Sequence, residues 1–290
     1  MRRVLKVLIA IPAVVFAALA YVYLTLPDVR VLATENPTTT AFMELRAREA
    51  AAEGRTLRHE HRWVPYSRMS QSLKRAVLVA EDDAFWEHEG IDFAQLRAIV
   101  EEDLARGRPI RGASTITQQL AKNLYLSPSR DPMRKVRELI IARRMEAALS
   151  KARIFELYLN LIEWGDGVWG AEAAARRYFG TSAASLSPSQ AALLAGAIIN
   201  PRRYSPARPV GRLLARQKII MSRMGEVTPP VPLPVIAPAP AAPPAAEGED
   251  FTDELPETPA TTPSPAPPDT APQEQTPAPG SSDRGADRTR

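Results

Sequence analysis

The chain lacks cysteine and contains only three histidines among its 290 residues. Without cysteine, disulfides, thiol nucleophiles and cysteine-based metal sites are all excluded. His59 and His61 alternate on a segment that we expect to be extended, and no third ligand lies nearby, so we interpret them as a surface pair and not as a metal site. His88 is expected to hydrogen-bond the local turn beside Gly90. Neither compartment nor chemistry follows from these residues.

Runs of alternating apolar and polar residues are also missing, so no strand of useful length is expected. Apolar residues instead recur three or four apart over most of the chain, as in amphipathic helices. The spacing predicts helices at 38–58, 91–104, 115–124, 133–149, 152–161, 171–178 and 188–199, with 59–66 extended. A mainly α domain of about 190 residues is therefore predicted.

Aromatic residues are nearly absent from the C-terminal part, which is rich in proline. Seventeen of the 28 prolines lie between Pro229 and Pro279, so we predict that 227–290 is a disordered tail. That tail carries ten acidic and three basic residues, which leaves 34 basic against 23 acidic in the rest of the chain. A balance of +11 favours anionic partners, whether lipid headgroups, phosphorylated substrates or nucleic acid.

Charge is absent from 7–26, a run of twenty residues that is long enough to cross a hydrocarbon core as a helix. Arg2, Arg3 and Lys6 precede it, which predicts a cytoplasmic N-terminus and an inner-membrane anchor with a single span. A cleaved signal peptide is the alternative, because Ala18-Leu19-Ala20 has the small-x-small form, but the apolar run exceeds the usual h-region. The predicted divisions are 1–27 (cytoplasmic stub and anchor), 28–62 (linker and juxtamembrane helix), 63–226 (catalytic domain) and 227–290 (tail).

Acidic residues gather after a predicted helical stripe formed by Leu73, Val77, Ala80 and Ala84. The stripe brings Glu81 next to a buried face, where a carboxylate can act as an acid or base. The run Glu101-Glu102-Asp103 is interpreted only as a solvated face.

Amides and cations follow in the next predicted helices. Ser114 is expected to cap the helix 115–124, on which Gln118 and Lys122, and likewise Gln119 and Asn123, lie four apart. If the loop that contains Arg130 folds back, the cations Lys122, Arg130 and Lys135 converge on a volume suited to a diphosphate. The alternative of solvated helix faces with intrahelical ion pairs stays open.

The order of these motifs resembles that of the family 51 peptidoglycan glycosyltransferases, from about Trp63 to Gly225. The matching motifs are Glu81-Asp82-x-x-Phe85-x-x-His88-x-Gly90, the stretch Gly112–Asn123, Arg134-Lys135-x-x-Glu138, Tyr158-Leu159-Asn160 with Gly165-Asp166-Gly167 and 170–174, and finally 186–196 with 200–206. Ala113 departs from the family pattern, which has a second glycine there. No transpeptidase module is expected after Gly225, so the chain resembles the monofunctional enzyme.

The resemblance implies a lysozyme-like helical fold that polymerises lipid II into glycan strands and releases undecaprenyl diphosphate, with the catalytic domain on the periplasmic side of the bacterial inner membrane. Glu81 would be the general base, and Glu138 would either orient the cations or hold a divalent ion, Mg or Mn, against the phosphates. The implied substrate-binding residues are Asp82, Ser114, Thr115, Gln118, Gln119, Lys122, Asn123, Arg130, Arg134 and Lys135.

The expected partners are lipid II, the growing glycan strand, membrane lipids and other cell-wall synthesis proteins, and no nucleic acid. A lytic glycosidase on the same fold is one alternative, although it would not require the cations between Lys122 and Lys135. An inactive, membrane-anchored envelope scaffold with a Pro-rich arm is the other. Nucleic-acid binding would explain the basic charge but not the anchor.

Overall fold

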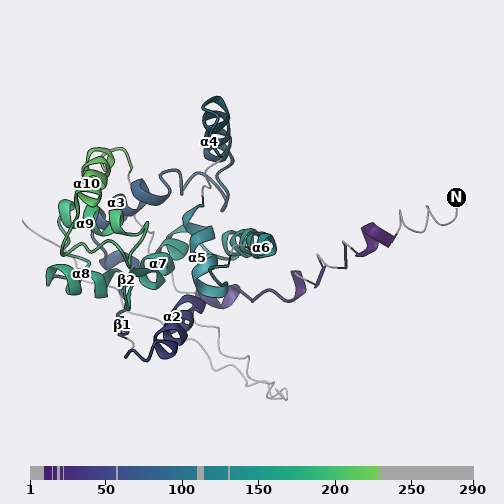
Figure 1. Ribbon diagram of the computed structural model, residues 1–290, viewed down its shortest axis with the longest axis horizontal. Helices are drawn as coiled ribbons and strands as arrows, with labels where there is room; N and C mark the ends of the chain where they lie inside the picture. Colours follow the sequence, from purple (N-terminus) through teal and green to yellow (C-terminus); the bar gives the residue numbers. More distant parts are fainter. Residues whose placement is uncertain are drawn as a thin grey trace, which may run out of the picture. The chain divides into compact units, whose positions relative to one another are not determined.

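The computed structural model describes residues 10–14, 16–17, 20–21, 23–56, 58–109, 114–129, 131–227 and 229. The described chain is mainly helical, as predicted (Figure 1). Its helices are α2 (Ala41–Ala52), α3 (Gln71–Glu81), α4 (Phe93–Ala105), α5 (Ile116–Tyr125), α6 (Pro132–Ala148), α7 (Lys151–Leu161), α8 (Ala171–Phe179), α9 (Pro188–Ala197) and α10 (Gly211–Arg223), with the 3-10 turns η1 (Arg30–Ala33) and η2 (Tyr66–Arg68).

Several predicted features fall wholly or partly outside this description. They are parts of the anchor at 7–26, the loop residues 110–113, Arg130 and almost all of the tail at 227–290. Within the described ranges, no helix has both the length and the hydrophobicity needed to cross a membrane.

Helix α3 carries the first acidic motif at its C-terminal end. Ser70 caps its start, since the Ser70 hydroxyl accepts a hydrogen bond from the backbone amide of Leu73 at 3.1 Å. Leu73 and Val77 are fully buried, in agreement with the predicted stripe. The helix packs against α9 and α10, which fixes the position of Glu81, its last residue (Figure 1).

Helix α5 lies at the centre of the amide-rich part of the molecule. It packs against α6, α7 and α2, and Ile116 and Leu120 on its inner face are fully buried. Figure 1 shows α5 between α7 and α6. Side chains on the remaining faces of α5 can therefore meet residues from α3, α6 and α7.

A small sheet includes part of the segment 59–66, which was predicted to be extended, but its other two strands were not expected. Its strand order is β1-β3-β2, with β1 (Glu60–His61) parallel and β2 (Glu163–Gly165) antiparallel to β3 (Val168–Trp169). Strands of two or three residues are too short to give an alternating pattern in the sequence. Gly167, at the turn before β3, has a φ of 71°, and an added Cβ would lie 2.1 Å from a backbone oxygen, so the turn requires glycine.

Two helix predictions need correction, and one helix was not predicted. The helix predicted at 38–58 is shorter, because Thr40 caps α2 and the chain turns at Gly54, where φ is 63°. Thr115, and not Ser114, caps α5: its hydroxyl accepts a hydrogen bond from the Gln118 amide at 3.3 Å. The sequence reasoning also missed α10 altogether.

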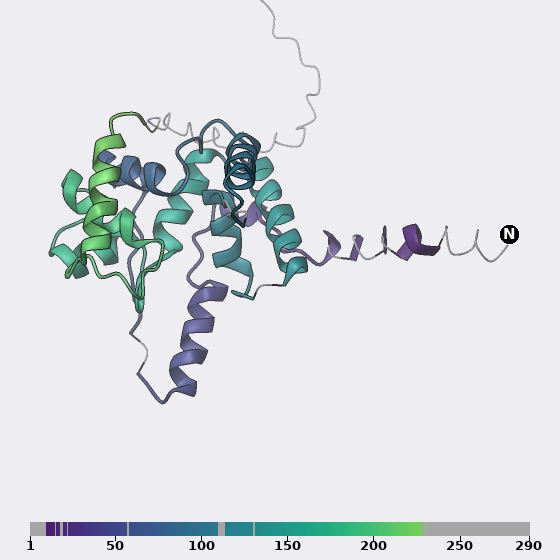
Figure 2. The same cartoon turned by 45° about the horizontal axis from the view of Figure 1, so that its top comes forward.

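Helix α4 projects from the other helices (Figures 1 and 2). Phe93, Leu96 and Leu104 lie on one side of it and are exposed, with Phe93 at 69% and Leu104 at 66%. The interpretation of 101–103 as a solvated face is wrong for Asp103, which is fully buried and pairs with Arg108 at 3.0 Å. A buried carboxylate needs such a partner to offset its lost hydration.

Candidate active site

The carboxylate of Glu81 is largely withdrawn from solvent and has a partner on each oxygen. Its side chain is 12% exposed. Oε2 accepts a hydrogen bond from Nε2 of Gln119 at 2.9 Å, and Oε1 lies 3.3 Å from Nη2 of Arg216 on α10. The end of α3 thus presents one acid between α5 and α10.

The pKa of Glu81 is raised above its ordinary value, chiefly because burial penalises the charged form. The hydrogen bond from Gln119 and the charge of Arg216 act in the opposite direction, and the neighbouring charge of Asp82 adds to the increase. A carboxylate whose pKa is raised towards neutrality is a better proton acceptor than an exposed one.

Gln119 is held in one orientation by both ends of its amide group. Its Nε2 donates to Glu81 and, at 3.3 Å, to the backbone oxygen of Ser114. Its Oε1 accepts from the Tyr158 hydroxyl at 2.9 Å. Tyr158 is fully buried, and burial, followed by the charges of Glu81 and Asp82, raises the pKa of its hydroxyl well above the ordinary value, so this donor stays protonated.

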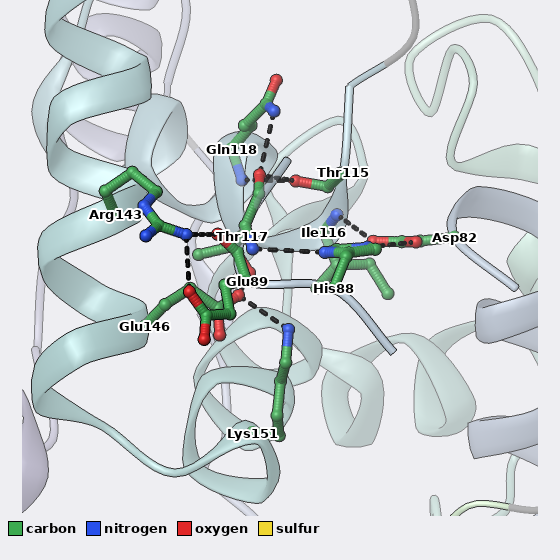
Figure 3. A network of polar contacts seen from close by, with 11 residues as sticks. Asp82, His88, Glu89, Thr115, Ile116, Thr117, Gln118, Arg143, Glu146 and Lys151 are labelled. Carbon is green, nitrogen blue, oxygen red and sulfur yellow. Dashed lines mark hydrogen bonds and ion pairs between the residues drawn. The ribbon is translucent and has the colours of Figure 1, made fainter. Parts of the chain in front are cut away.

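Asp82 connects the end of α3 to the start of α5 (Figure 3). Its Oδ2 accepts the backbone amide of Ile116 at 2.9 Å, and its Oδ1 lies 2.9 Å from Nε2 of His88. The amide of Gly90 donates to Nδ1 of His88 at 3.2 Å, which confirms the predicted contact with that turn and leaves Nε2 to donate to Asp82. Asp82 is 4% exposed, so both of its carboxylate oxygens form their hydrogen bonds inside the protein.

Two further side chains of the amide motif turn inwards to the same loop. The Thr115 hydroxyl donates to the backbone oxygen of Gly90 at 2.8 Å, and Nε2 of Gln118 donates to that oxygen at 2.9 Å (Figure 3). The loop after α3 and the first turn of α5 are therefore fixed to each other. Oε1 of Gln118 remains directed to α6.

Glu138 lies buried between two cations of its own helix. Nη1 of Arg134 is 2.6 Å from Oε2, and Nζ of Lys135 is 2.5 Å from Oε1. Lys135 also donates to Oε1 of Gln118 at 2.9 Å and to the hydroxyl of Ser114 at 3.2 Å. These contacts hold the Lys135 ammonium over the start of α5, although its side chain remains 39% exposed.

A continuous set of contacts joins the two acidic residues. Glu138 pairs with Lys135, Lys135 binds the Ser114 hydroxyl, the Ser114 carbonyl accepts from Gln119, and Gln119 binds Glu81. Although Ser114 does not cap α5, it joins the cationic and the acidic parts of the site.

Lys122 faces a separate space beside these contacts. Within the described ranges its ammonium group forms no hydrogen bond or ion pair. Together with Gln119, Asn123 and Tyr158 it lines a cavity of about 220 Å³. Burial lowers the pKa of Lys122, while the charge of Glu138 and, more weakly, that of Glu81 act to raise it. Lys122 therefore lies within the electrostatic reach of both acids.

Two predicted binding residues remain, Asn123 and Arg130. The side-chain amide of Asn123 donates to the backbone oxygen of Gln119 at 2.8 Å, one turn earlier on α5. Arg130 lies outside the described residues, so its convergence with Lys122 and Lys135 stays a prediction.

The donor sets do not favour a bound metal ion. Both oxygens of Glu138 are paired with cations, and no second carboxylate in the described structure is in contact with it. In the described part of the chain, Asp82, His88 and Asp92 are the group with metal-like spacing. The oxygens of Asp82 are already used by hydrogen bonds, and we assign no metal there.

Sequence reasoning missed Arg216 and the use of Tyr158. Arg216 is one of 37 basic residues and lies 135 positions from Glu81. Its helical spacing relative to the core residues Leu213 and Ile220 would have been the only local signal for α10. Tyr158 belongs to a motif that the sequence analysis identified, but no role could be given to its hydroxyl.

The chain is similar to known proteins over most of its length. Residues 48–225 match the protein family described as Transglycosylase. A biosynthetic peptidoglycan transglycosylase of Aromatoleum aromaticum is 50% identical over 196 residues, which cover 67% of this chain and 84% of that protein. Proteins with the same name from Azoarcus sp. and Dechloromonas aromatica are 50% and 49% identical, over 66% and 65% of this chain and 82% of each relative.

Proposed function

Since the chain belongs to the transglycosylase family, we propose that it is a peptidoglycan glycosyltransferase, which polymerises lipid II into glycan strands and releases undecaprenyl diphosphate. The observation that carries the proposal is that a buried carboxylate and a cationic cluster belong to one connected site. Glu81 and Lys135 are joined through Ser114 and Gln119, so a base and a phosphate-binding group are held at a fixed separation.

In the proposed reaction, the 4-hydroxyl of the acceptor sugar attacks the anomeric carbon of the donor. The new bond joins that oxygen to the anomeric carbon, and the bond from the anomeric carbon to the phosphate oxygen breaks. Glu81 takes the hydroxyl proton, and attack opposite the leaving group inverts the anomeric centre. Burial of Glu81 supports this role because it makes the carboxylate more basic.

The diphosphate leaving group needs charge stabilisation more than it needs a proton. Lys122 supports this role, because it is partly desolvated and its ammonium has no hydrogen bond or ion pair among the residues described, only the Phe42 ring 5.9 Å away. Lys135 and Arg134 would complete the set together with Arg130, and Ser114, Gln118 and Asn123 would contribute hydrogen bonds to sugar or phosphate. Asp82 and Thr115 would act by holding the start of α5 in place.

For Glu138 we propose the orienting role. Its two close ion pairs support this choice, because a divalent ion bound there would have to displace Arg134 and Lys135. A carboxylate that neutralises two cations in the absence of substrate also prevents them from repelling each other. No step of the proposed reaction passes through a metal.

We further propose a lysozyme-like arrangement of the domain and a location at the bacterial inner membrane. Residues 7–26 would form the single span, with the catalytic domain on the periplasmic side. The exposed apolar side of α4, with Phe93, Leu96 and Leu104, supports contact with lipid near the bound substrate. The tail at 227–290 would remain a disordered arm.

The test is polymerisation of radiolabelled lipid II by purified full-length protein in detergent, with Glu81→Gln as the variant and Glu87→Gln as its matched control. Glu87 is exposed and lies six residues further along the same motif. We expect Glu81→Gln to lose nearly all polymerisation and Glu87→Gln to keep it. Near-normal polymerisation by Glu81→Gln would reject the assignment of the base. Cleavage of purified peptidoglycan without polymerisation would identify a lytic glycosidase instead.

A further inference from the structure

Two arginines of α10 reach the C-terminal end of α3. Nη2 of Arg216 lies 3.3 Å from Oε1 of Glu81 and 3.0 Å from the backbone oxygen of Ala80. Two helical turns later, Nη2 of Arg223 lies 2.6 Å from Oδ2 of Asp83. Arg216 connects α10 to α3 and Arg223 connects α10 to the residues just after α3, but only Arg216 contacts the proposed base.

Arg216 differs from a surface arginine, because part of its guanidinium group is buried. Its side chain is 31% exposed, and its Nε atom is buried without a hydrogen-bond partner in the described structure. Burying a cation is costly unless an opposite charge lies close. Glu81 is the acidic residue in contact with it, so the two charges stabilise each other.

The other groups that face Glu81 do not replace this contact. Gln119 binds the other oxygen and carries no charge, and Tyr158 acts on Gln119. Lys122 on α5 affects Glu81 only at longer range, and Asp82 repels it. Without Arg216, Oε1 would have neither a direct partner nor a neighbouring positive charge.

We propose that Arg216 is a positioning residue for the general base: it fixes Oε1 of Glu81 and supplies the positive charge beside the buried carboxylate. The inference rests on the proposed function, because it concerns the same base. It gives α10 a role in positioning the base, although this helix lies outside the acidic and amide-rich motifs. Arg216 itself need not touch the substrate.

The test is the pH dependence of kcat/KM for lipid II polymerisation by Arg216→Gln, with Arg223→Gln as the matched control. An opposite charge at this distance lowers a carboxyl pKa, so its removal should move the acidic limb of the profile to higher pH by about 1 unit. At a pH on that limb, the loss of rate should be about tenfold and should be partly recovered by raising the pH. Arg216→Lys, which retains the charge, should restore the position of the limb.

Arg223→Gln removes a more exposed link between α10 and the residues that follow α3, so it should lower the midpoint of thermal unfolding and leave the limb unmoved. Equal profiles for wild type, Arg216→Gln and Arg223→Gln would overturn the inference. A limb that moved equally in both variants would also overturn it, because a general loosening of α10 would then be the cause.

If Arg216→Gln does not fold, Arg216→Met decides, since it removes the charge but keeps an apolar side chain of similar length, and its limb should move to higher pH in comparison with Arg223→Met. The proposed function has a separate test in Glu81→Gln. An active Glu81→Gln would reject the proposed base, whereas an inactive Glu81→Gln with an unmoved Arg216→Gln profile would reject only the role of Arg216.

Discussion

Replacement of Asp82 by alanine tests whether the acidic motif holds the site together. The Asp82 carboxylate is 4% exposed and accepts hydrogen bonds from the Ile116 amide and from Nε2 of His88, each at 2.9 Å. The Ile116 bond fixes the first turn of α5, the helix that carries Gln119. Removal of the Asp82 carboxylate should therefore lower the stability of the protein and disturb the orientation of Gln119, which binds Glu81.

The magnitude follows from the two donors that would lose their acceptor. Each buried donor left without a partner costs about 1–3 kcal/mol. Ile116 is fully buried and His88 has a side-chain exposure of 9%, so water can replace little of what is lost. We expect Asp82→Ala to lower the free energy of unfolding by about 2–6 kcal/mol. Asp82→Asn, which keeps one acceptor oxygen, should lose less.

Urea unfolding at neutral pH, followed by circular dichroism, measures this free energy. Asp92→Ala is the control: Asp92 caps the projecting helix α4 through the Gln95 amide at 2.8 Å, and its loss should cost about 1 kcal/mol. A cost below about 1 kcal/mol for Asp82→Ala would refute the reasoning. If Asp82 instead bound substrate directly, Asp82→Asn would raise KM for lipid II and leave the stability nearly unchanged.

Three further predictions concern the base, the cations and a turn. Because burial raises the pKa of Glu81, the folded protein binds a proton more readily than the unfolded chain, and the wild type loses stability as the pH rises through the raised pKa. The unfolding free energy of Glu81→Gln relative to wild type should thus increase from about pH 4 to pH 8 in urea titrations, and a decrease would contradict the raised pKa. Lys135→Ala should lower kcat/KM for lipid II by about 10–100-fold through the loss of charged hydrogen bonds, whereas its exposed neighbour Arg137→Ala should not; equal rates over all lipid II concentrations would argue against the diphosphate site. Gly170→Ala should destabilise by more than about 2 kcal/mol, because φ there is 80° and an added Cβ would lie 2.6 Å from a backbone oxygen, while Gly211→Ala, with open space, should be nearly neutral in the same urea assay.

Local chemistry explains the parts of the fold that could be predicted. Helices α5, α6 and α7 begin and end within a few residues of their predicted limits, because caps and apolar spacing act over neighbouring residues. Ser150 caps α7 and Ser187 caps α9 in this way. The order of the acidic, amide and cationic motifs could be read along the chain for the same reason.

The cap of α5 shows where such reasoning fails. Ser114 and Thr115 have nearly the same capping propensity, so the sequence could not decide between them. The choice depends on Lys135, which lies 21 residues away and binds the Ser114 hydroxyl, and on the Gly90 carbonyl, which accepts from Thr115. The small sheet has the same explanation, since β1 pairs with a strand more than 100 residues away.

That one acid follows a buried helical stripe, with amides and cations next, could be predicted from the chain alone, because these patterns depend on neighbouring residues. The surroundings of Glu81 could not be predicted in this way: one carboxylate oxygen binds Gln119, which Tyr158 holds, and the other contacts Arg216. These partners come from α5, α7 and α10, and their proximity results from the packing of whole helices. No spacing of residues along the chain specifies that packing, and the environment that makes the carboxylate basic therefore exists only in the folded protein.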